Sequence, residues 1–200
     1  MKITWLSHSC FEFKLPSKTI LVDPFFSGNS LAPSYNGKPD LVFVTHSHFD
    51  HADAKKFDCT VVCPSTCKFK KTLIMKVGDK RNVEGVDVEM ISASHHQDSY
   101  PTGYIFELEG KRIAHLGDTY IDGVKKLPNI DLLLLPIGGF FTMTIDEAVK
   151  ALEIISPKLA IPMHYNTLPQ IKADPSDFKQ KAEKKGFKVR VLKIGETIEY

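Results

Sequence analysis

The stretch Thr45-His46-Ser47-His48-Phe49-Asp50-His51 directly follows the apolar run Leu41-Val42-Phe43-Val44. It places three histidines and one aspartate within six residues. Imidazole and carboxylate groups are the side chains that zinc and similar divalent ions take as ligands. His46 and His48 are two positions apart, so they point the same way in an extended segment. Because Asp50 and His51 follow where the chain is expected to turn, one loop can supply ligands to two adjacent metal ions.

A plainer interpretation of the same stretch is open as well. Histidines in a loop are often simply exposed to solvent, and Asp50 could cap a helix that begins near His51. A chance cluster of four metal-binding side chains is uncommon, however, so the composition of the stretch favours metal binding.

The bulk composition restricts the class of protein. A chain of 200 residues that is 42% hydrophobic can bury one core, so we expect a single domain over residues 1–200. The formal net charge is only +2, and the lysine-rich stretches 68–71 and 179–188 are interpreted as solvated faces. The sequence has no strongly basic charge of the kind that binds nucleic acid, no apolar run long enough to span a membrane and no signal-peptide pattern. We therefore expect a cytoplasmic protein with no nucleic-acid or membrane partner.

The four cysteines are expected to be free thiols, because nothing in the sequence indicates secretion. Three of them are spaced by four residues, which is a weak pattern for a soft-metal site. No fourth thiolate is near, so a metal role is disfavoured for this group: Cys59, Cys63 and Cys67.

The order of elements predicts an α/β protein, with hairpins early and strand–helix alternation later. Helices are expected at 52–57, 65–75, 144–155 (which opens with a capping box) and 175–185 (which opens with Asp174-Pro175). Strands are expected at 2–6, 11–15, 19–22, 41–44, 60–63, 86–91, 103–109, 111–116, 131–135, 158–161, 187–194 and 197–200.

The remaining polar candidates share one position, directly after a predicted strand. They are Asp23, the pair His95-His96, Asp118 and His164. In α/β sheets, ligands gather at the carboxyl ends of strands, where loops are held by a rigid scaffold. Each candidate is weak alone, but their shared position predicts a single polar site.

The ordered set His46-x-His48-x-Asp50-His51, His95, Gly117-Asp118-Thr119 and His164 resembles the signature of the metallo-β-lactamase-fold hydrolases over nearly the whole chain. Four further stretches are similar to those of small metal-dependent hydrolases related to the ascorbate-phosphate lactonases. They run from Trp5 to Phe11 (WLSHSCF), from Asp23 to Phe25 (DPF), from Pro136 to Met143 (PIGGFFTM) and from Pro162 to Thr167 (PMHYNT).

This resemblance implies a fold, a cofactor and a set of ligands. The fold would be a four-layer αββα sandwich with two mixed β-sheets, in a single metallo-hydrolase domain. The cofactor would be two divalent metal ions, zinc first, with manganese, iron or nickel as alternatives. Asp50 and Asp118 would be the catalytic carboxylates. The first metal would be held by His46, His48 and His95, the second by Asp50, His51 and His164, and both by Asp118.

The chain departs from the family pattern at two positions. Ser7 stands where the family usually has glycine, and His96 stands where it commonly has serine. Neighbouring side chains in an extended segment point in opposite directions, so only one of His95 and His96 can face a metal. The frame Ala93-Ser94-His95 matches the family better and favours His95.

The function implied is hydrolysis of an ester, lactone or phosphodiester bond in a small-molecule substrate by a metal-bridged hydroxide. Two alternatives are an iron-dependent redox enzyme on the same scaffold and a non-catalytic, metal-stabilised binding module. His8 and Asp23 are candidates to orient the ligands, with plain structural roles as the alternative. Phe140 and Phe141 could form the apolar tip of a loop that covers the site, or they could pack in the core. The protein could also form a homo-oligomer.

Overall fold

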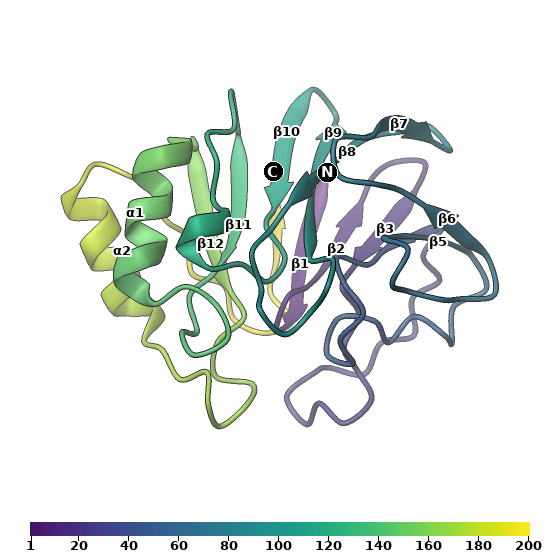
Figure 1. Ribbon diagram of the computed structural model, residues 1–200, viewed down its shortest axis with the longest axis horizontal. Coiled ribbons are helices and arrows are strands. Elements are labelled where there is room, and N and C mark those ends of the chain that lie inside the picture. The colour runs from purple at the N-terminus through teal and green to yellow at the C-terminus, as the bar shows by residue number, and fades with distance from the viewer. The chain divides into compact units, whose positions relative to one another are not determined.

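A computed structural model describes all 200 residues, Met1–Tyr200. The chain divides into two compact units, each built on one β-sheet (Figure 1). Unit 1 comprises Met1–Lys76, Asp98–Tyr100 and Leu192–Tyr200, and unit 2 comprises Val77–Gln97 and Pro101–Val191.

The sheet of unit 1 is mixed, with the strand order β13-β1-β2-β3-β4-β5-β6. The first three strands and β13 pair antiparallel, whereas β3, β4, β5 and β6 pair parallel. The bounds are β1 Lys2–Ser7, β2 Cys10–Lys14, β3 Thr19–Val22, β4 Leu41–Phe43, β5 Thr60–Cys63, β6 Thr72–Ile74 and β13 Thr197–Glu199.

The parallel part of this sheet determines where polar residues gather in unit 1. All three residues of β4 are buried, as expected for a short apolar strand covered on both faces. In the register, Val22 of β3 pairs with Phe43 of β4, and Phe43 pairs with Val62 of β5. The carboxyl ends of β3, β4 and β5 therefore lie at one edge of the sheet.

The sheet of unit 2 has the order β12-β11-β10-β9-β8-β7. Strands β7 to β10 pair antiparallel, and β10, β11 and β12 pair parallel, so this sheet is mixed too. The bounds are β7 Lys80–Val83, β8 Val86–Ser92, β9 Thr102–Leu108, β10 Lys111–His115, β11 Leu132–Pro136 and β12 Leu159–Met163, with a 3-10 turn η1 at Ile121–Gly123.

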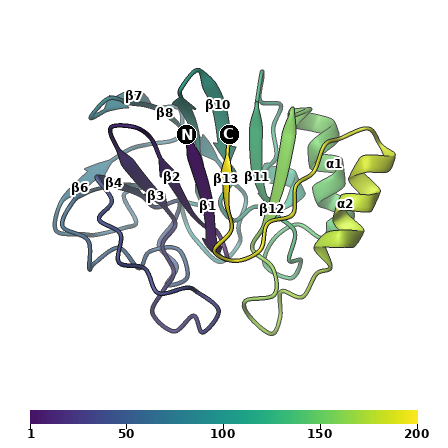
Figure 2. The ribbon, with the colours of Figure 1, turned by 180° about the vertical axis from the view of Figure 1, so that it is seen from behind.

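Unit 2 also carries the two helices, α1 Ile145–Ile155 and α2 Pro175–Lys184, which lie beside β11 and β12 (Figures 1 and 2). The predicted capping box at the start of α1 is present, with the Thr144 side chain accepting from the Glu147 backbone. At the start of β11, the Lys158 ammonium lies 2.8 Å from Asp131 and holds the pKa of that carboxyl below its usual value.

The helices predicted at 52–57 and 65–75 are wrong, and unit 1 contains no helix. In the first segment, the Asp53 carboxylate accepts hydrogen bonds from the N–H groups of Phe26 and Ser27 and does not cap a helix. In the second, a turn closes between Pro64 and Cys67, and residues 72–74 extend along β5 as the edge strand β6. Local helix propensity therefore yields to contacts with distant backbone.

The prediction for 187–194 is also wrong, because only Val189 forms an isolated bridge, to Ala160. The other predicted strands are present with bounds that differ by one or two residues, and the structure contains two strands that were not predicted, β6 and β7.

The α/β class with two mixed sheets is confirmed, and all four cysteines are free thiols, as expected. A single domain over 1–200 stays a prediction. Neither α1 nor α2 has the length and apolar character that crossing a membrane demands.

Candidate metal centre

The loop after β4 carries four of the predicted ligands in unit 1. His46 and His51 are fully buried, Asp50 is nearly so, and His48 is half-buried. The loop turns tightly at His48, whose carbonyl accepts from the N–H groups of His51 and Ala52 at 3.0 Å each. This turn brings the imidazole rings together: the centroid of His46 lies 4.6 Å from that of His48 and 4.2 Å from that of His51.

Asp23, at the end of β3, orients two of these histidines. Its carboxylate is fully buried and accepts from the Thr45 N–H at 2.8 Å, the Thr45 hydroxyl at 2.7 Å and the His51 Nδ1 at 2.8 Å. Because the single hydroxyl proton of Thr45 goes to Asp23, the Thr45 oxygen must accept from His46 Nδ1, 3.0 Å away. Both histidines therefore carry their proton on Nδ1, so in both the lone pair that can bind a metal is on Nε2.

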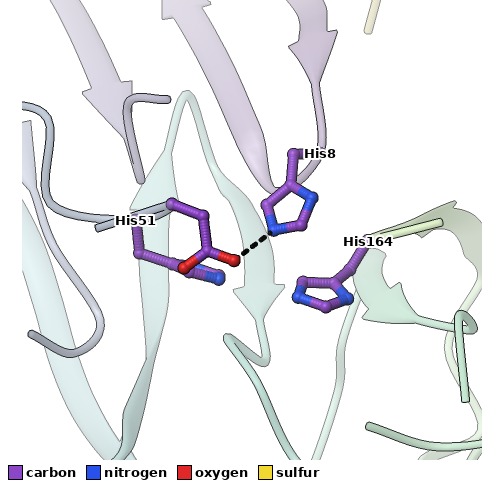
Figure 3. A group of neighbouring side chains, drawn as sticks. His8, His51 and His164 are labelled. Atoms are coloured by element: carbon purple, nitrogen blue, oxygen red, sulfur yellow. Dashed lines mark ion pairs between the residues drawn. The ribbon is translucent and has the colours of Figure 1, made fainter. Parts of the chain in front are cut away.

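His8 contacts the same loop from the end of β1. Its Nε2 lies 3.2 Å from Asp50 Oδ2, and Figure 3 shows this ion pair as a dashed line. The metal-binding atoms of His8, Asp50 and His51 lie within 4.8 Å of one another. Trp5 Nε1 donates to the His8 carbonyl at 2.9 Å and so fixes the backbone from which the imidazole projects.

Unit 2 brings together the other three predicted ligands, all of them buried. His164 Nε2 lies 3.1 Å from Asp118 Oδ2, and His95 Nε2 lies 3.9 Å from the same oxygen. His95 Nδ1 lies 3.0 Å from the Phe141 carbonyl, which can only accept, so His95 also presents Nε2. The carboxylate of Asp118 thus faces one imidazole from each of two strand ends.

The neighbouring histidines 95 and 96 have different surroundings. His96 is exposed, and its ring stacks on Tyr120 with centroids 4.9 Å apart. His95 is 4% exposed and is the one that faces Asp118. The geometry therefore favours His95, while its role as a ligand stays a prediction.

Three of the site's residues share a backbone feature that the sequence did not indicate. His8, Asp23 and His164 each follow a strand directly and adopt positive φ angles of 56°, 45° and 56°. Non-glycine residues rarely occupy this left-handed region, and those that do are concentrated at functional sites. Each of the three side chains contacts a polar residue of its own unit: His8 contacts Asp50, Asp23 contacts His51, and His164 contacts Asp118.

The loop Gly138–Met143 contacts the predicted ligands of unit 2 or their neighbours. Its Phe141 carbonyl accepts from His95, and its Met143 N–H donates to the carbonyl of Thr119, next to Asp118. Gly138 packs so closely on the His164 carbonyl oxygen that an added Cβ would lie only 2.2 Å from it. Phe140 at the loop tip is 69% exposed, so of the two expectations for it, core packing is wrong.

A second support, in unit 1, was missed at the sequence level. Asp98 accepts from the Ser47 hydroxyl at 2.7 Å and the Tyr100 N–H at 2.7 Å. Burial alone would raise the pKa of Asp98, but these hydrogen bonds outweigh burial and hold the pKa below its usual value. The charged carboxylate thus anchors the loop between His46 and His48. Asp98 follows no strand, so no positional pattern distinguished it.

The donor sets of both units suit divalent metal ions of the zinc type. They consist of imidazole nitrogens and carboxylate oxygens, with no thiolate. Three of the histidines have Nδ1 held by the Thr45 hydroxyl, the Asp23 carboxylate or a backbone carbonyl, as is usual for metal-binding histidines.

Comparison with known proteins agrees with this chemistry. The family model of the β-lactamase superfamily domain matches residues 2–164. The UPF0173 metal-dependent hydrolase of Archaeoglobus fulgidus is 37% identical, with 100% of this chain and 99% of that protein covered. Its counterpart from Methanosarcina barkeri is 39% identical, with 100% and 98% covered.

Among solved structures, the metallo hydrolase Igni18 of Ignicoccus hospitalis superposes with a TM-score of 0.85 at 31% identity, covering 100% of this chain and 98% of its own. The match extends over both units, and together with the family match it shows that the fold is the metallo-β-lactamase fold. The chain therefore belongs to the β-lactamase superfamily and, within it, to the UPF0173 metal-dependent hydrolases.

Proposed function

We propose that this hydrolase holds two divalent ions and uses them to cleave an ester, lactone or phosphodiester bond of a small molecule. The observation that carries the proposal is that the Asp23 carboxylate accepts from His51 Nδ1 and from the Thr45 hydroxyl, which in turn accepts from His46 Nδ1. Both rings therefore carry their metal-binding lone pair on Nε2. The proposed ligands are His46, His48, Asp50, His51, His95, Asp118 and His164.

Zinc is the ion we propose first, because imidazole and carboxylate together suit it and no thiolate is present. Manganese, iron and nickel are alternatives. When bound, two such ions supply an ionised water as nucleophile at neutral pH and Lewis-acid stabilisation of the developing oxyanion.

The chain's own residues have three tasks in this scheme. Asp50 and Asp118 are the carboxylates that contact the Nε2 atoms of His8, His95 and His164, and they would offset the positive charge of the ions. Asp23, Thr45 and the Phe141 carbonyl fix the tautomers and ring orientations. His8 holds Asp50 in place through the 3.2 Å contact with its Oδ2. All of these groups are buried or nearly so except Phe141, whose backbone carbonyl is the contacting atom.

The test is turnover by metal-free protein that is reconstituted with one ion at a time. Suitable substrates are 4-nitrophenyl acetate, δ-valerolactone and bis(4-nitrophenyl) phosphate. We expect hydrolysis of at least one class that disappears on chelation and returns with zinc or manganese. His48→Ala should lose metal and turnover together. Full metal content in that variant would contradict the ligand assignment, and absence of metal-stimulated turnover on all three classes would contradict the function.

The same measurements separate the alternatives. Iron and visible colour in freshly purified protein, without hydrolysis, would favour an iron-dependent redox enzyme. Tight metal binding without any turnover would favour a binding module. We further propose that the protein acts in the cytoplasm without a nucleic-acid or membrane partner, and size-exclusion chromatography tests for a homo-oligomer.

A further inference from the structure

A pocket of about 380 Å³ opens in unit 1 beside the metal-binding loop. One wall is this loop itself, from Ser47 and Phe49 to Lys55. The opposite wall is the loop after β5, residues 66–69, and Ser27 in the loop after β3 completes the rim. The pocket thus lies at the carboxyl ends of three parallel strands, where α/β sheets bind their ligands.

Two lysines on the walls give the pocket a positive charge. Lys55 and Lys68 are exposed, and neither forms an ion pair or a hydrogen bond within the chain. Nearby Lys71, in contrast, is paired with Asp58 at 2.8 Å. The one carboxylate of the lining, Asp53, is occupied by the N–H groups of Phe26 and Ser27. The cationic charges of the pocket are therefore available to a ligand.

The inner surface of the pocket offers apolar contacts as well. Phe49 is 70% exposed, although an aromatic ring next to buried ligands would ordinarily pack inward. The Phe49 ring packs edge-to-face against the Phe25 ring, with the two ring centroids 5.7 Å apart. Phe69 on the opposite wall is half-buried against the core of unit 1. An exposed aromatic ring that is fixed in this way is suited to bind the apolar part of a ligand.

We propose that this pocket binds the distal part of the substrate, and that the substrate is an organic anion with an apolar body. Phe49 and Phe69 contact the apolar body, and the ammonium groups of Lys55 and Lys68 bind a carboxylate, phosphate or sulfonate group. The inference rests on the proposed hydrolytic function and narrows its substrate class. It assigns to Lys55 and Lys68 a role in specificity and none in the chemistry.

Binding is tested first, with benzenesulfonate as an anionic probe that is a poor metal ligand. Calorimetric titration of metal-free and metal-loaded protein is compared for the wild type, for Lys55→Met/Lys68→Met, and for Lys38→Met. Lys38 is a matched control, because it too is exposed and without an ion pair but lies outside the pocket. We expect the double variant to weaken binding about tenfold, since two exposed charge pairs are lost, and the control to match the wild type. Benzyl alcohol should bind all three proteins equally.

Turnover is tested second, with 4-nitrophenyl butyrate and its anionic counterpart, mono(4-nitrophenyl) glutarate. The double variant should lose about tenfold in kcat/KM for the anionic ester, through KM, and stay within twofold for the neutral ester. Benzenesulfonate binding that is equal in the double variant and the wild type would overturn the pocket assignment, whatever the turnover. Absence of metal-dependent turnover with lysine-dependent binding intact would instead contradict the proposed function alone.

Discussion

The substitution Asp23→Asn separates the shape of a buried carboxylate from its charge. Asp23 accepts three hydrogen bonds, from the Thr45 N–H, the Thr45 hydroxyl and His51 Nδ1. An asparagine of the same shape can retain the bond from the Thr45 N–H with its amide oxygen. Its amide nitrogen then faces two donors, the hydroxyl and the imidazole N–H.

The magnitude follows from those two lost bonds. At about 1.5 kcal/mol for each hydrogen bond to a charged group, losing both bonds lowers the free energy of unfolding of the metal-free protein by about 3 kcal/mol, and a tautomer change that restores the bond to His51 reduces this loss to about 1.5 kcal/mol. His51 can satisfy the new amide only by moving its proton to Nε2, which removes the lone pair from the metal-binding atom. Changes of this kind weaken metal affinity by roughly 10- to 100-fold.

The assay is a competition titration with a chelator for metal affinity, together with urea unfolding of the metal-free protein. Asp53→Asn is the matched control, because Asp53 also accepts two hydrogen bonds in unit 1 but contacts no histidine. We expect the control to lose stability while its metal affinity stays within about threefold of the wild type, well short of the 10-fold minimum for Asp23→Asn. Wild-type metal affinity in Asp23→Asn, or an equal loss in both variants, would refute the reasoning.

Three further predictions concern unit 2. His95→Ala should lose bound metal whereas His96→Ala should retain it, as metal analysis of the two purified variants would show; the reverse result would reassign the ligand. Gly138→Ala should lower metal content and thermal stability, because its Cβ would lie 2.2 Å from the His164 carbonyl oxygen, and wild-type values for both would contradict this contact. The pKa of Asp131 is lowered in the folded state, so its contribution to stability is present above pH about 4 and is lost as the pH falls through the folded pKa. The difference in Tm between the wild type and Asp131→Asn should therefore be clear at pH 6 and narrow below pH 4, and a constant difference would exclude this linkage.

The parts of the fold that the sequence predicted are those in which local pattern and tertiary contacts agree. The continuous apolar run at 41–44 is a buried strand, and the capping box at Thr144 opens a helix. The errors at 52–57 and 65–75 arise where distant groups compete with helix formation. In the first segment, Asp53 accepts hydrogen bonds from the backbone of the loop after β3. In the second, residues 72–74 pair with β5. No local pattern contains those partners.

The candidate site also contains features that the sequence predicted and features that it did not. The candidate residues and their position after strands could be predicted from the sequence, and the family resemblance selected the seven predicted ligands among them. The contacts that support these residues could not be predicted. The Thr45 hydroxyl accepts a hydrogen bond from His46 and donates one to Asp23, and the Phe141 backbone carbonyl orients His95. A threonine has no metal-binding signature, and a carbonyl has no signature in sequence at all. The positive φ angles of His8, Asp23 and His164 had no signal in the sequence either.

The central claim is that seven side chains hold two ions, and anomalous X-ray diffraction from crystals of the metal-loaded protein tests it most directly. The account predicts two anomalous peaks about 3.5–4 Å apart, with oxygen from Asp118 bound to both ions. It predicts His46 and His51 bound through Nε2, with Nδ1 turned toward Thr45 and Asp23. A single peak, or ions held by other side chains, would contradict it.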